Sequence, residues 1–585
     1  MNQITFLKGL DVLKQNVPKP LLHTTIVFAY ALDFLYSHSR EQPLQSRIYM
    51  LKAIGVQNLR SFSSSVHSDL KPLTVYLGRN SSGKSSLIRL FPLLRQSVEE
   101  TTTGPVLWYG RYVDYGNFNE AKCNECNDDD TITLRFDLAL DSTPAYIRNS
   151  ARNTNRFPPY DFSVEIKLAE QNQKTFAKSV SFKIDDSTIE VIPDYEEENT
   201  VVYARGRDFK CRINTEPTFK KDYKFLPIIS WFTDASKKNN AKADINDNKA
   251  LRDEYNLFIS RNLFREREAS HNKNICKFAA RNLLTFFHHN TKPETISQEL
   301  INIRAYSKDR LEHGVLSLFK NHKYFMKMME DPAAKNEFLD ILHPLILLKC
   351  YNSIAELINS GLTQSFLSVK YLAPIRANTE RFYRFQDLQV EEMDHTGSNL
   401  AMILNSFSDK ENHDFQNWTY DNFGFTAFVT TDGSHYAIKI KTENDNDEHN
   451  ISDMGYGYSQ VLPIIMSIWL EIHSEDSSSD EVTFVIEQPE LHLHPAYQNK
   501  LAHLFAKVIN SARESKKDIK FIFETHSQSM IDAIGDCIQN NVLSKDDVNI
   551  MIFDKNKESG TTAFTANFDD EGYFTNWPVG FFSGN

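Results

Sequence analysis

Residues 78–86 read GRNSSGKSS and contain a complete G-x-x-x-x-G-K-[ST] pattern. An apolar run, PLTVYL, precedes it, and a helical pattern, LIRLFPLLRQSVEE, follows it. This context suits phosphate binding, because glycines let backbone N–H groups face phosphate oxygens and the helix N-terminus adds its positive dipole end. Lys84 is expected on the β- and γ-phosphates of a nucleotide, and the Ser85 hydroxyl on Mg²⁺. The residues expected around the phosphates are Gly78, Arg79, Asn80, Ser81, Ser82, Gly83, Lys84, Ser85 and Ser86.

A second apolar strand, in the segment VTFVIEQPELHLHP (482–495), ends in acidic residues. Its apolar run stops at Glu487, which is followed by Gln488, Pro489 and Glu490. A carboxylate at the end of a strand behind a phosphate loop is typical of a magnesium ligand that acts through water. The sequence therefore predicts Ser85 and Glu487 as the metal-binding residues.

A third apolar strand, FIFETHS (521–527), ends in Thr525, His526 and Ser527. A single histidine is usually a structural residue. Ligands of α/β sheets bind outside the carboxyl ends of the strands, however, so His526 is predicted to sense the γ-phosphate.

The segment SDMGYGYSQVLP (452–463) places Gly457, Ser459 and Gln460 at the mouth of an apolar helix. The simpler interpretation is a helix cap, with Ser459 at the start. The functional interpretation is that the N–H groups and Ser459 meet the γ-phosphate of a nucleotide held by another subunit.

Several kinds of element must position these residues. Period-two alternation over residues 131–214 predicts antiparallel strands, three- and four-residue spacing over 226–365 predicts helices, and the last 135 residues return to alternating strands and helices. Residues 1–45 are either an added helix or the product of an upstream start codon. The expected parts are an N-terminal extension (1–45), a head with the phosphate loop (46–116), a β-lobe (117–225), a helical insert (226–365), the rest of the head (366–540) and a short C-terminal domain (541–585).

Composition limits the class of protein. At 585 residues the chain is too long for one compact core, and 65 Lys and Arg against 77 Asp and Glu give a net charge of −12. This balance excludes a globally basic nucleic-acid coat. A local basic stretch is either a solvated helix face or a contact with DNA or RNA phosphates; its residues are Arg252, Arg261, Arg265, Arg267, Lys273, Lys277 and Arg281.

Nothing in the sequence predicts export or a membrane span. The N-terminus lacks the features of a secretory signal, and the six cysteines are few and scattered. The most apolar stretch, residues 21–36, contains His23 and Asp33 and is shorter than the roughly 20 residues that a span needs. We therefore expect a soluble cytoplasmic protein without membrane contact.

The order of these motifs resembles that of ABC-type ATPase heads, the class that includes SMC, RecF and OLD-type proteins. More narrowly, the chain resembles bacterial RecF/OLD-like AAA ATPases with a short C-terminal domain ending in W-P-x-G-F-F, here residues 577–582. The resemblance covers roughly residues 46–116 and 366–585. It is carried by LTVYLGRNSSGKSSLIRLFPLLRQSVE, GRYVDYGNF, YLAPIRANTERFY, DHTGSNLAMIL, DMGYGYSQVLP, VIEQPELHLHP, ETHSQ and DDEGYFTNWPVGFF.

The resemblance implies an α/β fold, a two-lobed ABC-type head with an inserted antiparallel β-lobe and a helical insert. It implies ATP and Mg²⁺ as cofactors, ATP hydrolysis, and a homodimer that closes around ATP. Family members are often encoded beside a separate effector in anti-phage defence loci, so control of a partner effector is the first functional hypothesis. A RecF-like repair ATPase that clamps DNA and a nearly non-hydrolysing ATP-gated scaffold are the alternatives.

One departure from the wider class affects the mechanism. In ABC transporters and SMC heads a glutamate follows the metal-strand carboxylate and polarises the attacking water, whereas this chain has Gln488, which cannot accept a proton. Either Glu490 is the base, or turnover is slow and ATP mainly holds a closed dimer. The predicted catalytic residues are Glu487, Gln488, Glu490 and His526. Only 45 residues follow Asn540, too few for the TOPRIM nuclease domain of some OLD-type relatives, so no nuclease domain is expected.

Overall fold

In the computed structural model all described residues belong to one compact unit, which lies within residues 49–140 and 158–585. The predictions for residues 1–45 and for Arg252, Arg261, Arg265 and Arg267 lie outside them. The described residues are 50–102, 104–124, 130–140, 160–194, 199–207, 210–215, 225–229, 272–303, 307–374, 376, 380–384, 392–432, 435–443, 447–473, 481–515, 517–556 and 560–577.

A six-stranded sheet holds the strands that carry the candidate residues. The strand order is β10-β15-β16-β3-β17-β18, and every neighbouring pair is parallel except β17 with β18. The central strands read as continuous apolar runs because both faces of the sheet are buried. Their bounds are β3 (Leu73–Gly78), β10 (Val369–Leu372), β15 (Glu481–Glu487), β16 (Asp518–Thr525), β17 (Val548–Asn556) and β18 (Gly560–Ala566).

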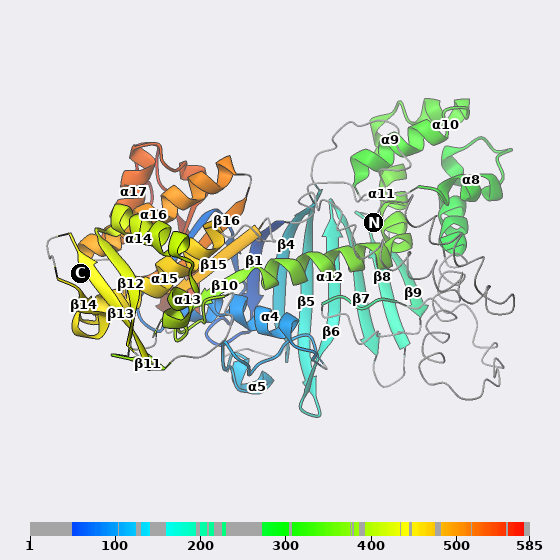
Figure 1. Ribbon diagram of the computed structural model, residues 1–585. Coiled ribbons are helices and arrows are strands. Elements are labelled where there is room, and N and C mark those ends of the chain that lie inside the picture. The colour runs from blue at the N-terminus through cyan, green and yellow to red at the C-terminus, as the bar shows by residue number, and fades with distance from the viewer. Residues whose placement is uncertain are drawn as a thin grey trace, which may run out of the picture. The chain divides into compact units, whose positions relative to one another are not determined.

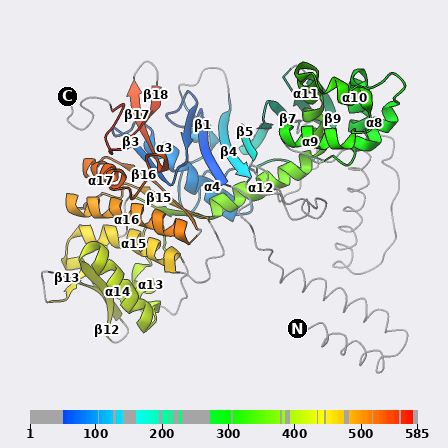
Figure 2. The same ribbon diagram turned by 90° about the horizontal axis from the view of Figure 1, so that it is seen from above.

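Helices cover this sheet. In Figure 2, α16 (Pro495–Glu514) and α17 (Gln528–Gln539) lie side by side next to β16. The α16 helix begins with Pro495 in its first turn, and the His494 ring accepts a hydrogen bond from the Ala496 N–H. The helix after the phosphate loop is divided at Arg89 into α3 (Lys84–Ile88) and α4 (Leu90–Glu99).

An eight-stranded antiparallel sheet forms the second layer of structure, in the order β2-β1-β4-β5-β6-β7-β8-β9. Figure 1 shows β4 to β9 following one another in shades of cyan. The period-two prediction for residues 131–214 is therefore confirmed, and β1 and β2, from before the phosphate loop, extend the same sheet. The bounds are β1 (Met50–Gln57), β2 (Val66–Asp69), β4 (Ile132–Leu140), β5 (Tyr160–Gln171), β6 (Lys174–Ile184), β7 (Ser187–Asp194), β8 (Asn199–Arg205) and β9 (Lys210–Thr215).

The predicted helical insert contains helices that pack on this antiparallel sheet. The α11 helix contacts β7 and β8, and α12 contacts β1 and α4. In the described part of the chain no single helix is long and apolar enough to cross a membrane. The pair α11 and α12, which is bent by 68°, has sufficient length and apolar composition only when the two helices are taken together. The helices are η2 (Leu284–Phe286), α8 (Pro293–Leu300), α9 (Lys308–Leu318), α10 (Lys323–Met328), α11 (Pro332–Lys349) and α12 (Tyr351–Leu367).

A four-stranded sheet carries the Gly-Ser-Gln segment. One hydrophobic core joins it to the parallel sheet, with Ile438 and Ile440 of β13, Ile465 of α15 and Phe505 of α16 all buried in it. The elements are β11 (Tyr383–Arg384), α13 (Leu400–Ser406), α14 (Asp409–Phe423), β12 (Phe425–Asp432), β13 (His435–Thr442), β14 (His449–Asn450), η3 (Ile451–Asp453) and α15 (Tyr456–His473).

The predicted α/β class, with an antiparallel sheet and helices, is confirmed. The core sheet draws strands from both ends of the chain, as expected. The residues assigned to a short C-terminal domain (541–585) supply β17, which pairs in parallel with β3 over Val548↔Leu73 to Phe553↔Gly78. The last strands thus complete the sheet that carries the phosphate loop.

Candidate nucleotide-binding site

Three parallel strands bring the predicted site residues to one edge of the sheet. The β16 strand lies between β3 and β15, and the register pairs Thr525 with Leu77 and Glu524 with Glu487. The carboxyl ends of parallel strands share one edge, where ligands of α/β sheets bind. The phosphate loop and the ends of β15 and β16 therefore lie at the same edge of the sheet.

The two glycines of the phosphate loop are required by its conformation. Gly83 has φ +100°, and a Cβ there would lie 2.7 Å from the Ser61 hydroxyl oxygen. A Cβ on Gly78 would lie 2.5 Å from the carbonyl oxygen of Phe553 on β17. The loop therefore follows a path that only glycine permits, and it leads directly into α3, whose first N–H groups have no intrahelical partner.

Lys84 folds back on the phosphate loop. Its ammonium group donates hydrogen bonds to the carbonyl oxygens of Gly78 and Arg79, each at 2.9 Å, and the residue is only 4% exposed. Burial lowers the pKa of Lys84, and the charges of Glu524 and Glu490 act in the opposite direction. The cation is thus held at the loop with exchangeable carbonyl partners that phosphate oxygens can replace.

Ser85 contacts a carboxylate that the sequence analysis did not select. Its hydroxyl lies 2.8 Å from Oε2 and 3.1 Å from Oε1 of Glu524, the penultimate residue of β16. Burial, followed by the nearby charge of Glu487, raises the pKa of Glu524 to about 7. The predicted metal-binding hydroxyl therefore has a buried acid beside it.

Glu487 is held by other groups. The Arg89 guanidinium forms a bidentate ion pair with it, with Nε to Oε1 and Nη2 to Oε2 both at 2.8 Å, and the Tyr371 hydroxyl donates to Oε1 at 2.6 Å. Glu487 is 1% exposed. This pair joins the end of β15 to the junction between α3 and α4.

We predict that Arg89→Met destabilises the protein by about 3–5 kcal/mol, because it leaves the Glu487 charge buried without a partner. Urea unfolding in the absence of nucleotide measures the loss. Arg513→Met is the matched control: Arg513 is similarly exposed (44% against 42%) and also pairs bidentately, but its partner Asp547 is 14% exposed rather than 1%. A loss of about 0–1 kcal/mol is expected there. Equal losses in the two variants would contradict this interpretation.

The predicted base, Glu490, lies at the turn after β15. Its Oε1 accepts a hydrogen bond from the His526 backbone N–H at 2.8 Å, while Oε2 is buried and has no hydrogen-bond partner among the described residues. Burial raises the pKa of Glu490. Gln488 adopts φ +44° and donates its backbone N–H to the Glu524 carbonyl, so it ties β15 to β16. A buried carboxylate with one unused oxygen suits a proton acceptor.

His526 follows the end of β16, and the residue is exposed. Burial of part of the ring and the charge of Lys84 lower the pKa of His526, which favours the neutral imidazole. Its position beside the phosphate loop is compatible with the predicted γ-phosphate contact, which stays a prediction.

Arg376 is a buried cation that the sequence analysis did not assign. It is 1% exposed, and its Nη2 donates to the backbone carbonyl of Glu487 at 3.2 Å. Its Nε and Nη1 find no hydrogen-bond partner in the described ranges. Burial lowers the pKa of Arg376 to about 10, against the opposing charges of Glu490 and Glu487. Gln460 donates its side-chain N–H to the Arg376 carbonyl at 3.5 Å, so Arg376 connects α15 to the end of β15.

At the mouth of α15 the structure exposes different groups from those expected. Ser459 is buried, and its hydroxyl donates to the Tyr456 carbonyl at 2.8 Å. Tyr456 is 61% exposed and its ring lies 5.7 Å from that of His492. Gly457 is half-buried on the first turn. On the first turn of α15 the exposed residue is therefore Tyr456, Gly457 is half-buried, and Ser459 is not accessible.

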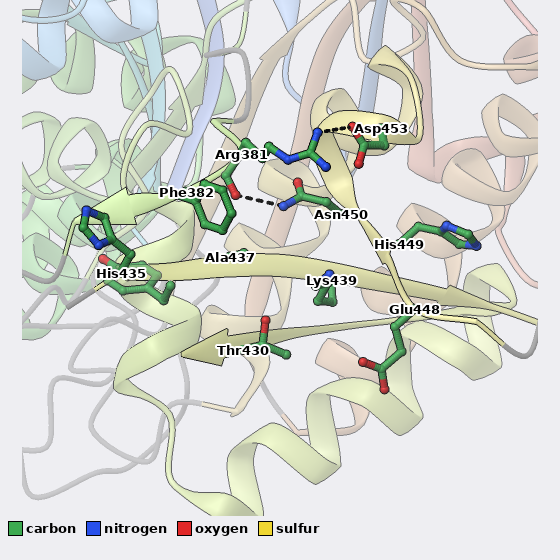
Figure 3. Close-up of a pocket in the computed structure, with 11 residues that line it drawn as sticks. Arg381, Phe382, Thr430, His435, Ala437, Lys439, Glu448, His449, Asn450 and Asp453 are labelled. Atoms are coloured by element: carbon green, nitrogen blue, oxygen red, sulfur yellow. Dashed lines mark hydrogen bonds and ion pairs between the residues drawn. The ribbon is translucent and has the colours of Figure 1, made fainter. Parts of the chain in front are cut away.

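A separate cavity of about 330 Å³ lies on the four-stranded sheet (Figure 3). Arg381 pairs with Asp453 at 3.0 Å at its border, and the Asn450 amide donates to the Arg381 carbonyl. None of the phosphate-loop or strand-end residues lines it. Asp453, which lines it, lies in η3 just before α15.

The residues present fit a nucleotide with Mg²⁺. Magnesium in such sites is bound by one or two protein oxygens together with phosphates and water, and Ser85 with Glu524 offers such a set. The described residues contain no group of three or more His, Cys, Asp or Glu side chains that could hold a metal ion.

The chain was compared with curated proteins, solved structures and protein families. No curated protein matches the chain. Among solved structures, the chain is similar to an SMC head bound to the C-terminal winged-helix domain of ScpA (8% identity, TM-score 0.32, covering 89% of this chain and 98% of that one). It is also similar to the SMC head domain from Thermotoga maritima (9% identity, TM-score 0.30, covering 88% and 98%).

The sequence match to a protein family is extensive. Residues 50–531, which hold the phosphate loop, the Gly-Ser-Gln segment and all three strand ends described above, match the family described as AAA ATPase domain. Membership of this family implies nucleotide binding. The chain belongs to the AAA ATPase domain family.

Proposed function

We propose that this protein is a Mg²⁺-dependent ATP hydrolase that closes into a dimer around ATP and thereby controls a partner effector. The observation that supports this most directly is that Lys84, Ser85 and Glu490 lie at one sheet edge, which brings together a buried cation, a hydroxyl and a carboxylate whose Oε2 has no hydrogen-bond partner in the described residues. Those groups supply phosphate binding, metal binding and a proton acceptor.

Nucleic-acid clamping is the second candidate. Of the basic stretch, the described residues Lys273, Lys277 and Arg281 are all exposed, on helical residues 272–282. Exposed Lys and Arg side chains on one helix suit contacts with phosphates of DNA or RNA. The nearly non-hydrolysing scaffold is the third candidate and is favoured by Gln488, which has no titratable group.

Steady-state phosphate release, measured with and without DNA or RNA, separates the three. The effector-control function predicts basal Mg²⁺-dependent hydrolysis that nucleic acid leaves unchanged. A clamp predicts stimulation by nucleic acid, which Lys273→Glu with Lys277→Glu would remove. No release above that of Lys84→Ala under either condition would favour the scaffold.

The dimer is testable at Gly457. A Cβ there would lie 3.4 Å from the His492 carbonyl oxygen, an ordinary contact, so Gly457→Glu should fold. We predict that this carboxylate repels the partner's γ-phosphate, so that ATP-dependent dimerisation weakens by about tenfold or more while ATP affinity of the monomer is unchanged. Light scattering across a concentration series measures the dimer. Asn417→Glu, which adds the same charge at an exposed position on α14, is the control. Equal dimerisation of both variants would remove the α15 mouth from the interface.

Control of a separate effector in anti-phage defence rests on the resemblance of the sequence motifs. Its test is a phage plating assay with the chain expressed alone and together with its neighbouring genes. Protection that needs both a neighbour and Lys84 would support the proposal, and protection that survives Lys84→Ala would contradict it.

A further inference from the structure

Arg376 is a buried cation that uses few of its hydrogen-bond donors. The residue is 1% exposed, and burial lowers its pKa to about 10, which still leaves the guanidinium protonated at neutral pH. Its Nη2 donates to the Glu487 carbonyl at 3.2 Å, while Nε and Nη1 are buried without a hydrogen-bond partner in the described residues. A buried charge is costly unless an opposite charge lies near it. The guanidinium therefore depends on a nearby carboxylate.

Two carboxylates act by their charge on this guanidinium, Glu490 more than Glu487, and the Tyr371 hydroxyl has a smaller effect. Glu487 is already paired with Arg89, which contacts both of its carboxylate oxygens. Glu490 accepts a hydrogen bond from the His526 backbone N–H, and its Oε2 is buried without a partner among the described residues. The buried guanidinium is therefore the cation left to compensate the charge of Glu490.

Hydrogen bonds hold Arg376 beside the turn that carries Glu490. Its Nη2 is bound to the carbonyl of Glu487, the last residue of β15, and Glu490 follows three residues later. From another side, the Gln460 side chain on α15 donates to the Arg376 carbonyl at 3.5 Å. Arg376 is thus attached both to α15 and to the start of the turn, which keeps its charge close to the carboxylate.

Burial and the surrounding polar groups act on Glu490 in opposite directions. Burial raises the pKa of Glu490 and so favours the protonated carboxyl, which cannot accept a proton from water. The His526 backbone N–H, the Thr525 hydroxyl and the charge of Arg376 favour the ionised form. Lys84, in the phosphate loop, is the other cation that interacts with Glu490 by its charge. A base at this position needs those groups in order to stay ionised.

We infer that Arg376 is a positioning residue for ATP hydrolysis, whose charge keeps the Glu490 carboxylate ionised at the turn after β15 so that it can accept the proton of the attacking water. Arg376 acts through Glu490 rather than on the nucleotide. This inference rests on the proposed function, because it presupposes that Glu490 is the base.

The test varies the charge at position 376 while a donor to the Glu487 carbonyl is retained. Arg376→Gln keeps an N–H donor and loses the charge, whereas Arg376→Lys keeps both. Single-turnover hydrolysis at saturating ATP and Mg²⁺ is measured over a pH series. We expect the acid limb of the Arg376→Gln profile to lie about one pH unit or more above that of wild type, because loss of a nearby positive charge raises the pKa of a carboxyl. Below the limb its rate should be about tenfold lower, and at alkaline pH it should recover.

Arg376→Lys should lie closer to wild type than Arg376→Gln does, and calorimetry should give both variants the ATP affinity of wild type. A double variant shows whether the effect passes through Glu490: Arg376→Gln combined with Glu490→Gln should hydrolyse no more slowly than Glu490→Gln alone. Arg513→Gln is the control, since Arg513 also pairs with a carboxylate but lies on α16, and it should keep the wild-type profile.

Each outcome decides the inference. A loss of rate in Arg376→Gln that is equal at every pH, equal profiles for Arg376→Gln and Arg376→Lys, or a further loss in the double variant would overturn it. If circular dichroism shows that Arg376→Gln does not fold, Arg376→Met, which keeps an unbranched apolar chain without the charge, takes its place. A wild-type rate in Glu490→Gln would instead remove Glu490 as the base, and this inference with it.

Discussion

Lys84→Ala should weaken ATP binding by about 10- to 150-fold, because it removes a charge-assisted phosphate contact worth roughly 1.5–3 kcal/mol. The substitution also removes the hydrogen bonds to the Gly78 and Arg79 carbonyls, but these oxygens lie in a loop that water can reach through its exposed residues 79–81. Calorimetric titration with ATP and Mg²⁺ measures the change.

Lys507→Ala is the control for that variant, since Lys507 is an exposed lysine on α16, away from the strand ends. It should bind ATP as wild type does. Unchanged affinity in Lys84→Ala, with both variants folded by circular dichroism, would contradict the phosphate-loop assignment.

Glu490→Gln should leave ATP binding intact and reduce turnover by about 10²-fold or more, the usual contribution of a general base. A glutamine oxygen can still accept the His526 backbone N–H that Oε1 accepts now, so the turn should keep its shape. What the variant loses is the proton affinity of Oε2, which has no other hydrogen-bond partner in the described residues. Single-turnover hydrolysis measures the chemical step without product release.

Two further variants show whether the effect is chemical. Glu514→Gln, at an exposed acid on α16, should hydrolyse at the wild-type rate. Gln488→Glu restores the acid found in the wider class and should hold or raise the rate. If Glu490→Gln hydrolyses as wild type does, Glu490 is not the base; if it unfolds earlier without losing rate, Glu490 only caps the turn.

Local patterns in the sequence predict the phosphate loop well. Gly78 and Gly83 stand where a Cβ would clash. Lys84 and Ser85 follow within a few residues, so the local chain geometry alone places them beside the glycines. The antiparallel strands of residues 131–214 are predicted for a similar reason, since side chains alternate between the two faces of a strand.

Chain order does not specify which acids contact Ser85 and Arg89. Ser85 and Glu524 are 439 residues apart, and Arg89 and Glu487 are 398 apart. Nothing in chain order says that β16 lies between β3 and β15. The sequence does contain one signal for Glu524. It is an acid at the end of an apolar run, as Glu487 is in its own strand.

The sequence pattern also does not predict which side chains of the Gly-Ser-Gln segment are buried. The motif places Ser459 near the helix start, but only the helix phase against the core shows that Ser459 and Gln460 turn inward while Tyr456 faces solvent. Likewise, residues 541–585 carry strand patterns, and only the pairing of β17 with β3 shows that they belong to the nucleotide-binding sheet.

The most direct test of the central claim, that this chain hydrolyses ATP at the three strand ends, is a single-turnover experiment with labelled ATP and excess wild-type protein. We expect the bound ATP to be converted fully to ADP with Mg²⁺, and no ADP to form in EDTA or with Lys84→Ala. Wild-type protein that binds ATP and Mg²⁺ tightly yet releases it unhydrolysed would contradict that claim.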